Sequence, residues 1–508
     1  MSDALPGLPR LERIEEEWLD PALIEPVAVD WARRRGLLPI RRDGRVLLAG
    51  SPETSLEAFE DLALLLGLEA EWVQAPAAEV QRAIDRCYFQ RAGAPPPPAT
   101  PGEEAPAPRR ETNDLLVSSA DAPVIQYVNM ILLEAVKRDA SDIHVEPFVD
   151  RLLVRYRIDG LLYEQPSPPR HLEQALTARL KVMARLDLAE KRLPQDGVAR
   201  VRVGAREIDV RVSSVPVAEG ERIVLRLLHR ESVRYALDEL GMAPGTLAQL
   251  RDILRAPNGI VLVTGPTGSG KTTTLYAALG ELDTAHLNVL TIEDPIEYQL
   301  PNIAQIQVHP KIGLTFARGL RHILRQDPDV VLVGEIRDLE TAEIVVRASL
   351  TGHLVFATLH TNDAASAVTR MVDMGIAPYL LAASGRAVLA QRLVRCLCRN
   401  CRRETAMTAD EAAGLDRPEL AGRSIWTAHA EGCDNCLGGY KGRTGIYELL
   451  VISPALAEAI RAGAPAAELR QRAAEDGGRD ILADGVDKIL AGTTTVAEVL
   501  RSAGTTRK

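Results

Sequence analysis

Residues 259–280 read GIVLVTGPTGSGKTTTLYAALG. The apolar run before the glycines predicts a buried β-strand, and the run after them predicts a helix. The loop between the two carries the pattern G-x-x-x-x-G-K-[ST]. Its glycines let the backbone wrap around an anion, while N–H groups and the helix N-terminus point at the same phosphates. This order of strand, loop and helix therefore predicts a nucleoside triphosphate site.

The residues of this loop have separate expected tasks. We expect Lys271 to reach the β- and γ-phosphates as a point charge, and the Thr272 hydroxyl to ligate Mg²⁺. The predicted ATP-binding set is the whole loop: Gly265, Pro266, Thr267, Gly268, Ser269, Gly270, Lys271, Thr272 and Thr273.

Three further apolar runs follow the loop, at residues 288–292, 330–333 and 354–359, and they alternate with helical patterns. This alternation predicts an α/β domain in which helices cover a mostly parallel sheet. In such sheets the ligand crevice lies outside the carboxyl ends of the strands. Polar residues that follow these strands are therefore candidates for the chemistry.

Acidic residues follow the first two of these strands. Glu293 and Glu297 follow the first strand, and Glu335 follows the second. A hydrolytic enzyme of this kind needs one carboxylate near Mg²⁺ and another that orients or deprotonates the attacking water. Gly334 occupies the position directly after the second strand, where an Asp is usual, so we expect Glu335 to serve the metal. Either Glu297 or Glu293 is then left to activate the water.

A histidine, His360, follows the third strand in the segment Leu359-His360-Thr361. An isolated histidine is more often a structural hydrogen-bonding residue than a catalytic one. Because this histidine lies at the carboxyl end of a strand, we expect its imidazole to sense or polarise the γ-phosphate.

Two C-x-x-C pairs occur in the C-terminal part, Cys398 with Cys401 and Cys433 with Cys436. Two such turns supply four thiolates for one tetrahedral Zn²⁺, and a structural zinc contributes about 10–16 kcal/mol to folding. We therefore expect a structural zinc site, with a redox pair as the alternative. Cys396 lies beside the first pair, so its part in the ligand set stays open.

The N-terminal part of the chain differs in composition from the rest. Residues 1–90 contain a predicted hairpin over 37–49 and helical spacing over 56–65, without a catalytic constellation. We interpret them as a small α+β docking domain rather than a structural lid. Residues 91–112 are rich in Pro, Ala and Gly and predict an extended linker.

Two larger domains follow the linker. Residues 113–230 predict an α+β domain that opens with a helix capped near Asp121. In its strand over 208–212, alternation places Arg211 on the face opposite the apolar residues. Such an arginine is solvated or paired, or acts as an arginine finger beside a triphosphate. Residues 231–508 hold the phosphate loop and the cysteine insert, at about 396–436.

Composition limits the functions that are plausible. The 508 residues carry a net charge of −10 with only 4% aromatic residues, which argues against a nucleic-acid groove or a base-stacking surface. The first twenty residues lack the pattern of a signal peptide, and no apolar run approaches the ~18 residues that cross a bilayer. We expect a cytoplasmic protein whose membrane association is peripheral.

Several segments together resemble the type II/IV secretion ATPase superfamily. They are GPTGSGKTTT, TIEDPIEY, LRQDPDVVLVGEIRDLETAE, TGHLVFATLHTNDA, QRLVR and GYKGRTGIYELL. The resemblance is closest to the assembly ATPases of type II secretion systems, and the type IV pilus extension ATPases are also similar. It covers the chain from about residue 113 onward and is weaker over the first ninety residues.

The resemblance implies a RecA-like ATPase domain preceded by a PAS-like domain, in a homo-hexameric ring on the cytoplasmic face of a bacterial inner membrane. It implies that Lys271 and Thr272 hold phosphate and Mg²⁺, and that residues 1–90 dock onto an inner-membrane platform protein. It further implies that Glu335 is the second-motif acid and Glu297 the catalytic glutamate, with His360 in the histidine box. The arginines that it places around the nucleotide are Arg211, Arg226, Arg321, Arg325, Arg337, Arg370 and Arg443.

The function that the resemblance implies is ATP hydrolysis coupled to pseudopilus assembly and to the export of folded proteins across the outer membrane. The nearest alternative is a type IV pilus extension or DNA-uptake motor. A second alternative is a nucleotide-gated scaffold in which slow hydrolysis times assembly. A nucleic-acid translocase that uses the zinc ribbon is disfavoured by the acidic composition.

Overall fold

The structure is a computed structural model of the 508-residue chain. It describes residues 9–20, 31–32, 35–52, 54–66, 71–84, 113–114, 123–203, 206–229 and 235–503, together with Leu23 and Val27. The predicted linker at 91–112 and the predicted cap at Asp121 lie outside the described residues. The chain divides into two compact units, Met1–Arg109 and Arg110–Lys508. None of the described helices is long and apolar enough to cross a membrane.

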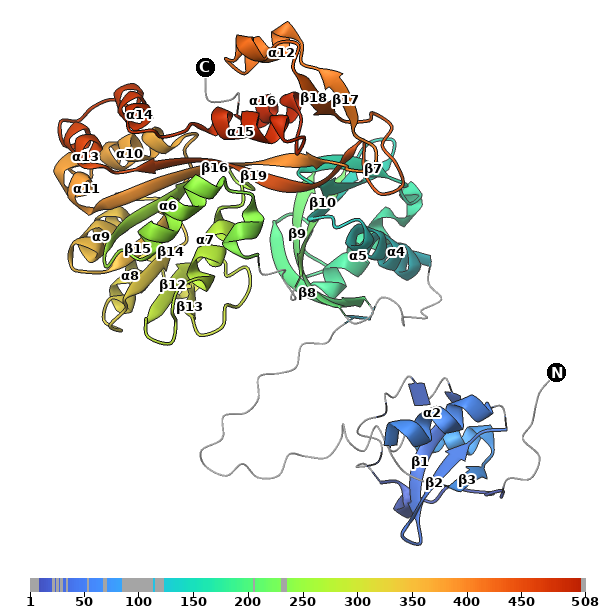
Figure 1. The fold of residues 1–508 in the computed structure, drawn as a ribbon. Helices are drawn as coiled ribbons and strands as arrows, with labels where there is room; N and C mark the ends of the chain where they lie inside the picture. Colours follow the sequence, from blue (N-terminus) through green and yellow to red (C-terminus); the bar gives the residue numbers. More distant parts are fainter. Residues whose placement is uncertain are drawn as a thin grey trace. The chain divides into compact units, whose positions relative to one another are not determined.

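The first unit contains a three-stranded sheet in the order β1-β2-β3, with an antiparallel hairpin β1–β2 and parallel pairing of β2 with β3 (Figure 1). Its turn is Asp43-Gly44, and both residues have positive φ, as a two-residue hairpin turn requires. Helix α2 packs Phe59 onto Trp72 of β3, with ring centroids 5.1 Å apart. The elements are η1 Glu16–Trp18, β1 Leu37–Arg42, β2 Arg45–Gly50, α2 Leu56–Leu66 and β3 Glu71–Gln74. The predicted hairpin and helix are confirmed.

The second unit begins with a seven-stranded sheet, the upstream sheet, in the order β4-β8-β9-β10-β5-β6-β7. Its strands are antiparallel except for β4, which runs parallel to β8. Helices α4 and α5 bury one face, where the apolar side chains of β9 lie, whereas Arg211 is half-buried on the other face. The elements are β4 Asn113–Asp114, α4 Pro123–Lys137, β5 Asp142–Pro147, β6 Leu152–Ile158, β7 Leu161–Gln165, η2 Arg170–Leu172, α5 Glu173–Met183, β8 Gln195–Val203, β9 Arg206–Val217 and β10 Gly220–His229.

The phosphate loop belongs to a second seven-stranded sheet, the central sheet, in the order β13-β12-β14-β15-β11-β16-β19. All pairs are parallel except β16 with β19. Its strands are β11 Gly259–Thr264, β12 Val289–Glu293, β13 Ala304–Gln307, β14 Val330–Val333, β15 Leu354–Leu359, β16 Gly385–Leu397 and β19 Tyr440–Val451. The α/β class with a mostly parallel sheet is confirmed. Sequence reasoning did not predict the long antiparallel pair β16–β19.

Helices cover both faces of the central sheet (Figure 1). Along β11 the side chains alternate, so that Ile260 and Leu262 pack with α8, α9 and α10, while Val261 and Val263 pack with α6 and α7. The helices up to β16 are η3 Leu237–Leu240, α6 Pro244–Leu254, α7 Lys271–Gly280, η4 Pro310–Ile312, α8 Phe316–Ile323, α9 Leu339–Leu350, α10 Ala364–Asp373 and α11 Pro378–Ser384.

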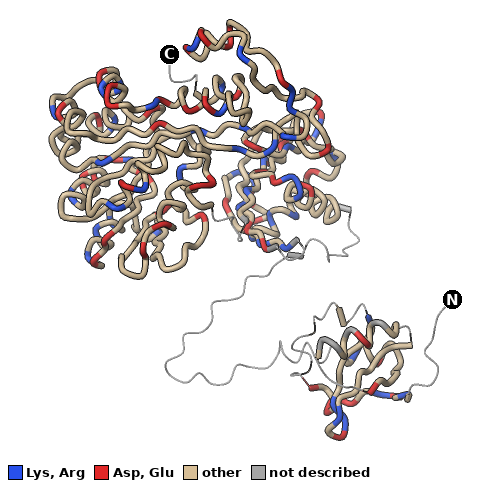
Figure 2. Tube along the Cα trace, viewed as in Figure 1, with Lys and Arg blue, Asp and Glu red and all other residues tan. Residues whose placement is uncertain are grey.

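Between β16 and β19 the chain forms a small insert, and four helices follow β19. The insert contains β17 Arg403–Ala406, α12 Ala409–Gly414, η5 Pro418–Leu420 and β18 Ser424–Thr427. The last helices are α13 Pro454–Arg461, α14 Ala466–Glu475, α15 Ile481–Leu490 and α16 Val496–Ala503. Basic and acidic residues are interspersed along the described chain (Figure 2).

Candidate functional site

The phosphate loop joins the end of β11 to the start of α7, as the sequence predicted. Gly270 precedes the helix with a φ of 87°, a left-handed conformation that favours glycine. A Cβ on Gly265 would lie 2.5 Å from the carbonyl oxygen of Gln391, so this position also needs glycine. From β16, the Gln391 side chain donates a 2.7 Å hydrogen bond to the carbonyl oxygen of Ser269. The loop is therefore supported by a neighbouring strand.

Lys271, the first residue of α7, folds back over this loop. Its ammonium donates hydrogen bonds to the carbonyl oxygens of Gly265, at 2.8 Å, and Pro266, at 3.1 Å. Burial lowers the pKa of Lys271 to about 8, although the charge of Glu335 opposes the shift. Arg392 on β16 adds to the lowering of this pKa. The arrangement places two cationic side chains at an anion-binding loop.

Glu335 and His360 meet at the carboxyl ends of β14 and β15. The His360 Nε2 lies 3.1 Å from a Glu335 carboxylate oxygen, and the His360 Nδ1 lies 3.5 Å from the Lys271 Nζ. Arg337 donates to the other Glu335 oxygen at 2.7 Å. The structure thus brings Lys271, Glu335 and His360 together, although they are far apart in the sequence. A cation, an imidazole and a carboxylate can here bind phosphate and a divalent metal.

The two carboxylates that the sequence left as alternatives have different surroundings. Glu293 is only 3% exposed and accepts a hydrogen bond from the Tyr276 hydroxyl. Glu297 is half-buried, and its carboxylate makes no hydrogen bond or ion pair with any residue that the structure describes. A water molecule can therefore reach Glu297 more readily than Glu293.

The seven predicted arginines fall into two groups. Arg211, from the upstream sheet, donates a 3.1 Å hydrogen bond to the carbonyl oxygen of Ile296, next to Glu297, and Arg337 contacts Glu335. The other five are not brought to these acids. Arg226 pairs with Asp142 at 2.9 Å, Arg321 with Glu340 at 2.5 Å and Arg443 with Asp159 at 3.5 Å, while Arg325 and Arg370 are exposed.

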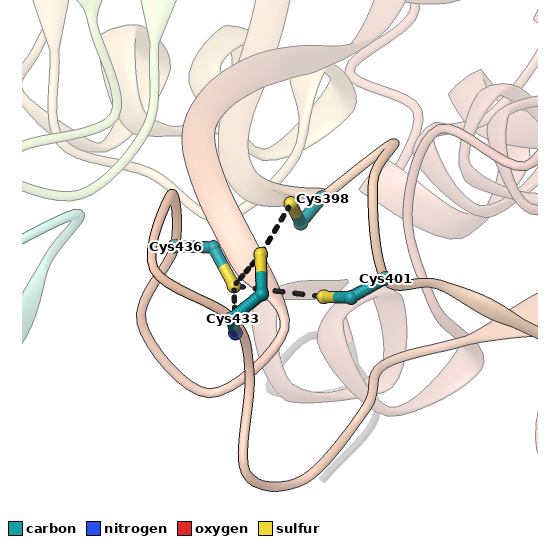
Figure 3. A group of neighbouring side chains, drawn as sticks. All are labelled: Cys398, Cys401, Cys433 and Cys436. Carbon is teal, nitrogen blue, oxygen red and sulfur yellow. Dashed lines mark hydrogen bonds between the residues drawn. The ribbon is translucent and has the colours of Figure 1, made fainter.

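The four cysteines of the two C-x-x-C pairs form one cluster (Figure 3). Their sulfur atoms all lie within 4.8 Å of one another, and the Cys398–Cys433, Cys401–Cys436 and Cys433–Cys436 pairs are 3.8, 3.6 and 3.6 Å apart. Metal–sulfur bonds of about 2.3 Å in a tetrahedron require sulfur–sulfur distances of about 3.8 Å. The donor set therefore fits Zn²⁺. Cys396 lies outside the cluster, at the irregularity in β16 between Arg395 and Leu397.

Sequence reasoning missed several residues that support the site. Gln391 holds the phosphate loop, and the buried Arg392 donates to the carbonyl oxygen of Asn362 at 2.7 Å. The Thr264 and Thr361 hydroxyls, 2.7 Å apart, join the ends of β11 and β15. The motif QRLVR contains Gln391 and Arg392, but its residues gave no local signal for these contacts.

Family models match two parts of the chain. The model described as Type II/IV secretion system protein matches residues 117–501, and the MshEN domain matches residues 7–94.

Individual relatives match most of the chain. The chain is 51% identical over 394 residues to Type II secretion system ATPase E of Vibrio cholerae, and the matched region covers 77% of each protein. It is 42% identical over 510 residues to Type IV pilus assembly ATPase PilB of Myxococcus xanthus, which covers 97% of this chain and 88% of that protein. Among solved structures, the pilus retraction motor PilT with bound ADP matches with a TM-score of 0.50 and 27% identity. That match covers 73% of this chain and 95% of PilT.

Proposed function

The chain belongs to the Type II/IV secretion system protein family, and on this premise we propose that it is the cytoplasmic ATPase of a type II secretion system. It couples ATP hydrolysis to pseudopilus assembly and to the export of folded proteins across the outer membrane. The observation that carries the proposal is the convergence of Lys271, Glu335 and His360 beside a glycine-rich loop. The type II relative, more similar in sequence than the pilus relative, favours this machine over a pilus motor.

In this proposal the residues of the site divide the work. The loop backbone and Lys271 bind the phosphates, and Thr272 and Glu335 hold Mg²⁺, which supplies charge neutralisation when bound. Glu297 orients or deprotonates the attacking water, since its carboxylate makes no hydrogen bond or ion pair with the described residues. His360 senses the γ-phosphate, and its Nε2 lies 3.1 Å from the Glu335 carboxylate, so the imidazole can couple the phosphate to this acid.

ATP then lies between the phosphate loop and the domain at 113–230, which contributes Arg211 to the site. The RecA-like domain at 231–508 carries the remaining chemistry. We propose a homo-hexamer, in which the outlying arginines of one subunit approach the nucleotide of its neighbour. The exposure of Arg226, Arg321, Arg325 and Arg370 on this chain supports that arrangement. Arg443, paired with Asp159, links the two domains.

Two further parts complete the proposal. The cysteine cluster holds a structural Zn²⁺, which the sulfur–sulfur distances of 3.6–3.8 Å support. Residues 1–90 form a docking domain, joined by the linker at 91–112, that binds an inner-membrane platform protein. The protein is thereby held on the cytoplasmic face of the inner membrane as a peripheral component, and it does not bind nucleic acid.

A deletion strain separates the two machines. Exoprotein release and pilus-dependent motility are scored side by side, with rescue by wild type and by Lys271→Ala. We expect lost secretion, normal motility and rescue by wild type alone. Lost motility with normal secretion would assign the protein to a pilus machine, the second candidate that the PilB relative supports. Full rescue by Lys271→Ala would contradict a role for ATP.

A further inference from the structure

A buried polar cluster lies beside the phosphate loop, on the side of β12. We name it the Glu293 network, and it consists of Glu293, Thr291, Tyr276 and Gln305. Glu293 and Thr291 lie on β12, Tyr276 on α7 and Gln305 on β13. The Glu293 and Tyr276 side chains are 3% and 2% exposed. The network therefore connects three elements, and its members Glu293 and Tyr276 are almost fully buried.

The Glu293 carboxylate accepts three hydrogen bonds within this network. One oxygen accepts from the Tyr276 hydroxyl, and the other accepts from the Thr291 hydroxyl and, at 3.2 Å, from the Gln305 amide. Burial, followed by the Glu293 charge, raises the pKa of Tyr276 far above its usual range, so that Tyr276 stays a donor. A carboxylate that is almost fully buried and already accepts three hydrogen bonds is poorly placed to take a proton from an attacking water.

The same network holds the backbone that directly follows Glu297 in the sequence. Gln305 donates to the carbonyl oxygen of Tyr298 at 3.1 Å and accepts from the N–H of Leu300 at 2.7 Å. The Tyr298 ring packs edge-on against Tyr276, with centroids 4.7 Å apart. On the residue before Glu297, Arg211 donates a hydrogen bond to the carbonyl oxygen of Ile296. Glu297 thus lies between two anchored neighbours, while its own carboxylate makes no hydrogen bond or ion pair with a residue that the structure describes.

Tyr276 connects this anchoring to the helix that follows the phosphate loop. It lies on α7, the helix that opens with Lys271 and Thr272. We propose that Tyr276 and Gln305 are positioning residues, which hold the Glu297 carboxylate at a fixed place relative to the bound phosphates, and that Glu293 is part of their support and not the base. This inference rests on the proposed role of Glu297.

The test is a double-mutant cycle on the full-length protein. Tyr276→Phe and Gln305→Leu are made alone and together with Glu297→Gln, and hydrolysis of radiolabelled ATP is followed, with Lys271→Ala as the blank. The Kd of ATP is measured by fluorescence titration, and the Tm by thermal unfolding. Tyr156→Phe is the matched control, because it also removes one buried phenol hydrogen bond, of 2.7 Å to the carbonyl oxygen of Ile131, but in the upstream sheet.

We expect Tyr276→Phe and Gln305→Leu each to lower kcat by about 10- to 100-fold, since small misplacements of a reacting group cost this much. The Kd of ATP should stay unchanged. Glu297→Gln alone should lower kcat by about 10²- to 10⁴-fold, and the second substitution should then cost nothing more. Tyr156→Phe should lower the Tm without lowering kcat.

Two results would overturn the inference. One is the same loss of kcat from Tyr276→Phe in the Glu297→Gln background; the other is a loss of ATP affinity as large as the loss of kcat. If Tyr276→Phe does not fold, the half-buried Gln305→Leu decides by the same cycle. Wild-type turnover by Glu297→Gln would overturn both this inference and the role of Glu297. Turnover by Lys271→Ala would instead contradict the proposed ATPase site.

Discussion

Glu448 on β19 is an ionisable residue with an unusual environment. It is 8% exposed, and burial followed by the charge of Asp363 raises its pKa to about 7. The N–H of Ala364 and the charge of Arg470 oppose this shift, whereas Asp480 adds to it. The group lies near Arg392, whose pKa burial lowers while Glu448 opposes the shift. Protonation of Glu448 therefore removes a negative charge that acts on Arg392, on the strand that supports the phosphate loop.

This raised pKa predicts a pH-dependent stability. Between about pH 4.5 and 7 the folded protein binds the Glu448 proton more tightly than the unfolded chain, so this contribution to the free energy of unfolding falls as pH rises. Glu448→Gln should remove the fall. We expect the free energy of unfolding of the variant, relative to that of the wild type, to rise by on the order of 3 kcal/mol from pH 5 to pH 8, as measured by chemical denaturation. An equal difference at both pH values would contradict the assignment.

The segment that follows the second cysteine pair contacts the upstream sheet. Leu437, directly after Cys436, packs against the apolar core of the upstream sheet. A few residues later the N–H of Gly442 donates to Asp159 at 2.9 Å, in the turn between β6 and β7. The loop that carries Cys433 and Cys436 thus lies beside a contact between the two sheets, which its small size alone would not indicate.

Metal removal should consequently destabilise more than the insert. We expect Cys433→Ser, or chelation of the wild type, to release one zinc per chain and to lower the Tm of the second unit, because a structural zinc contributes to folding directly. Metal content and Tm are measured together. Cys396→Ser is the control and should keep both, since Cys396 lies outside the cluster. Loss of zinc from Cys396→Ser would place that residue in the ligand set.

At the scale of the whole second unit, Arg211 reaches from the upstream sheet to the acidic segment at Ile296. We expect Arg211→Ala to lower kcat much more than it weakens ATP binding, because arginine fingers in related chemistry contribute about 10³–10⁵ to the rate. Phosphate release and ATP titration measure the two effects. Arg222→Ala is the control, since Arg222 lies on the same sheet but pairs with Glu146 at 2.7 Å. Equal losses in kcat and affinity would count against a finger.

The sequence predicted those parts of the molecule whose signals are local. The phosphate loop is a continuous motif, and the strands at 288–292, 330–333 and 354–359 are uninterrupted apolar runs because both faces of the sheet are covered. Strands β16 and β19 were missed, since Gln391, Arg392 and Glu448 interrupt their apolar pattern. Those side chains are buried only because distant segments supply their partners.

The candidate site follows the same division. Lys271 and Thr272 are specified by the loop itself, and Glu335 and His360 by their places after strands. The residue pattern alone left Glu293 and Glu297 as alternatives, because the surroundings of Glu293 depend on Tyr276 and Gln305, 17 and 12 residues away from it in the sequence. Single-sequence patterns carry no information about such contacts.

Strand β16 supports the phosphate loop through Gln391 and, four residues later, places Arg395 within 3.4 Å of the Tyr163 hydroxyl of the upstream sheet. Over these residues it pairs regularly with β19, and four residues of strand span about 13 Å. In mechanical terms this segment is stiff along its length, since a strand that is already extended and hydrogen-bonded lengthens little under load. A displacement of Gln391 along the strand would therefore reach Arg395, and so its contact with Tyr163, with little change in the length of the strand between them.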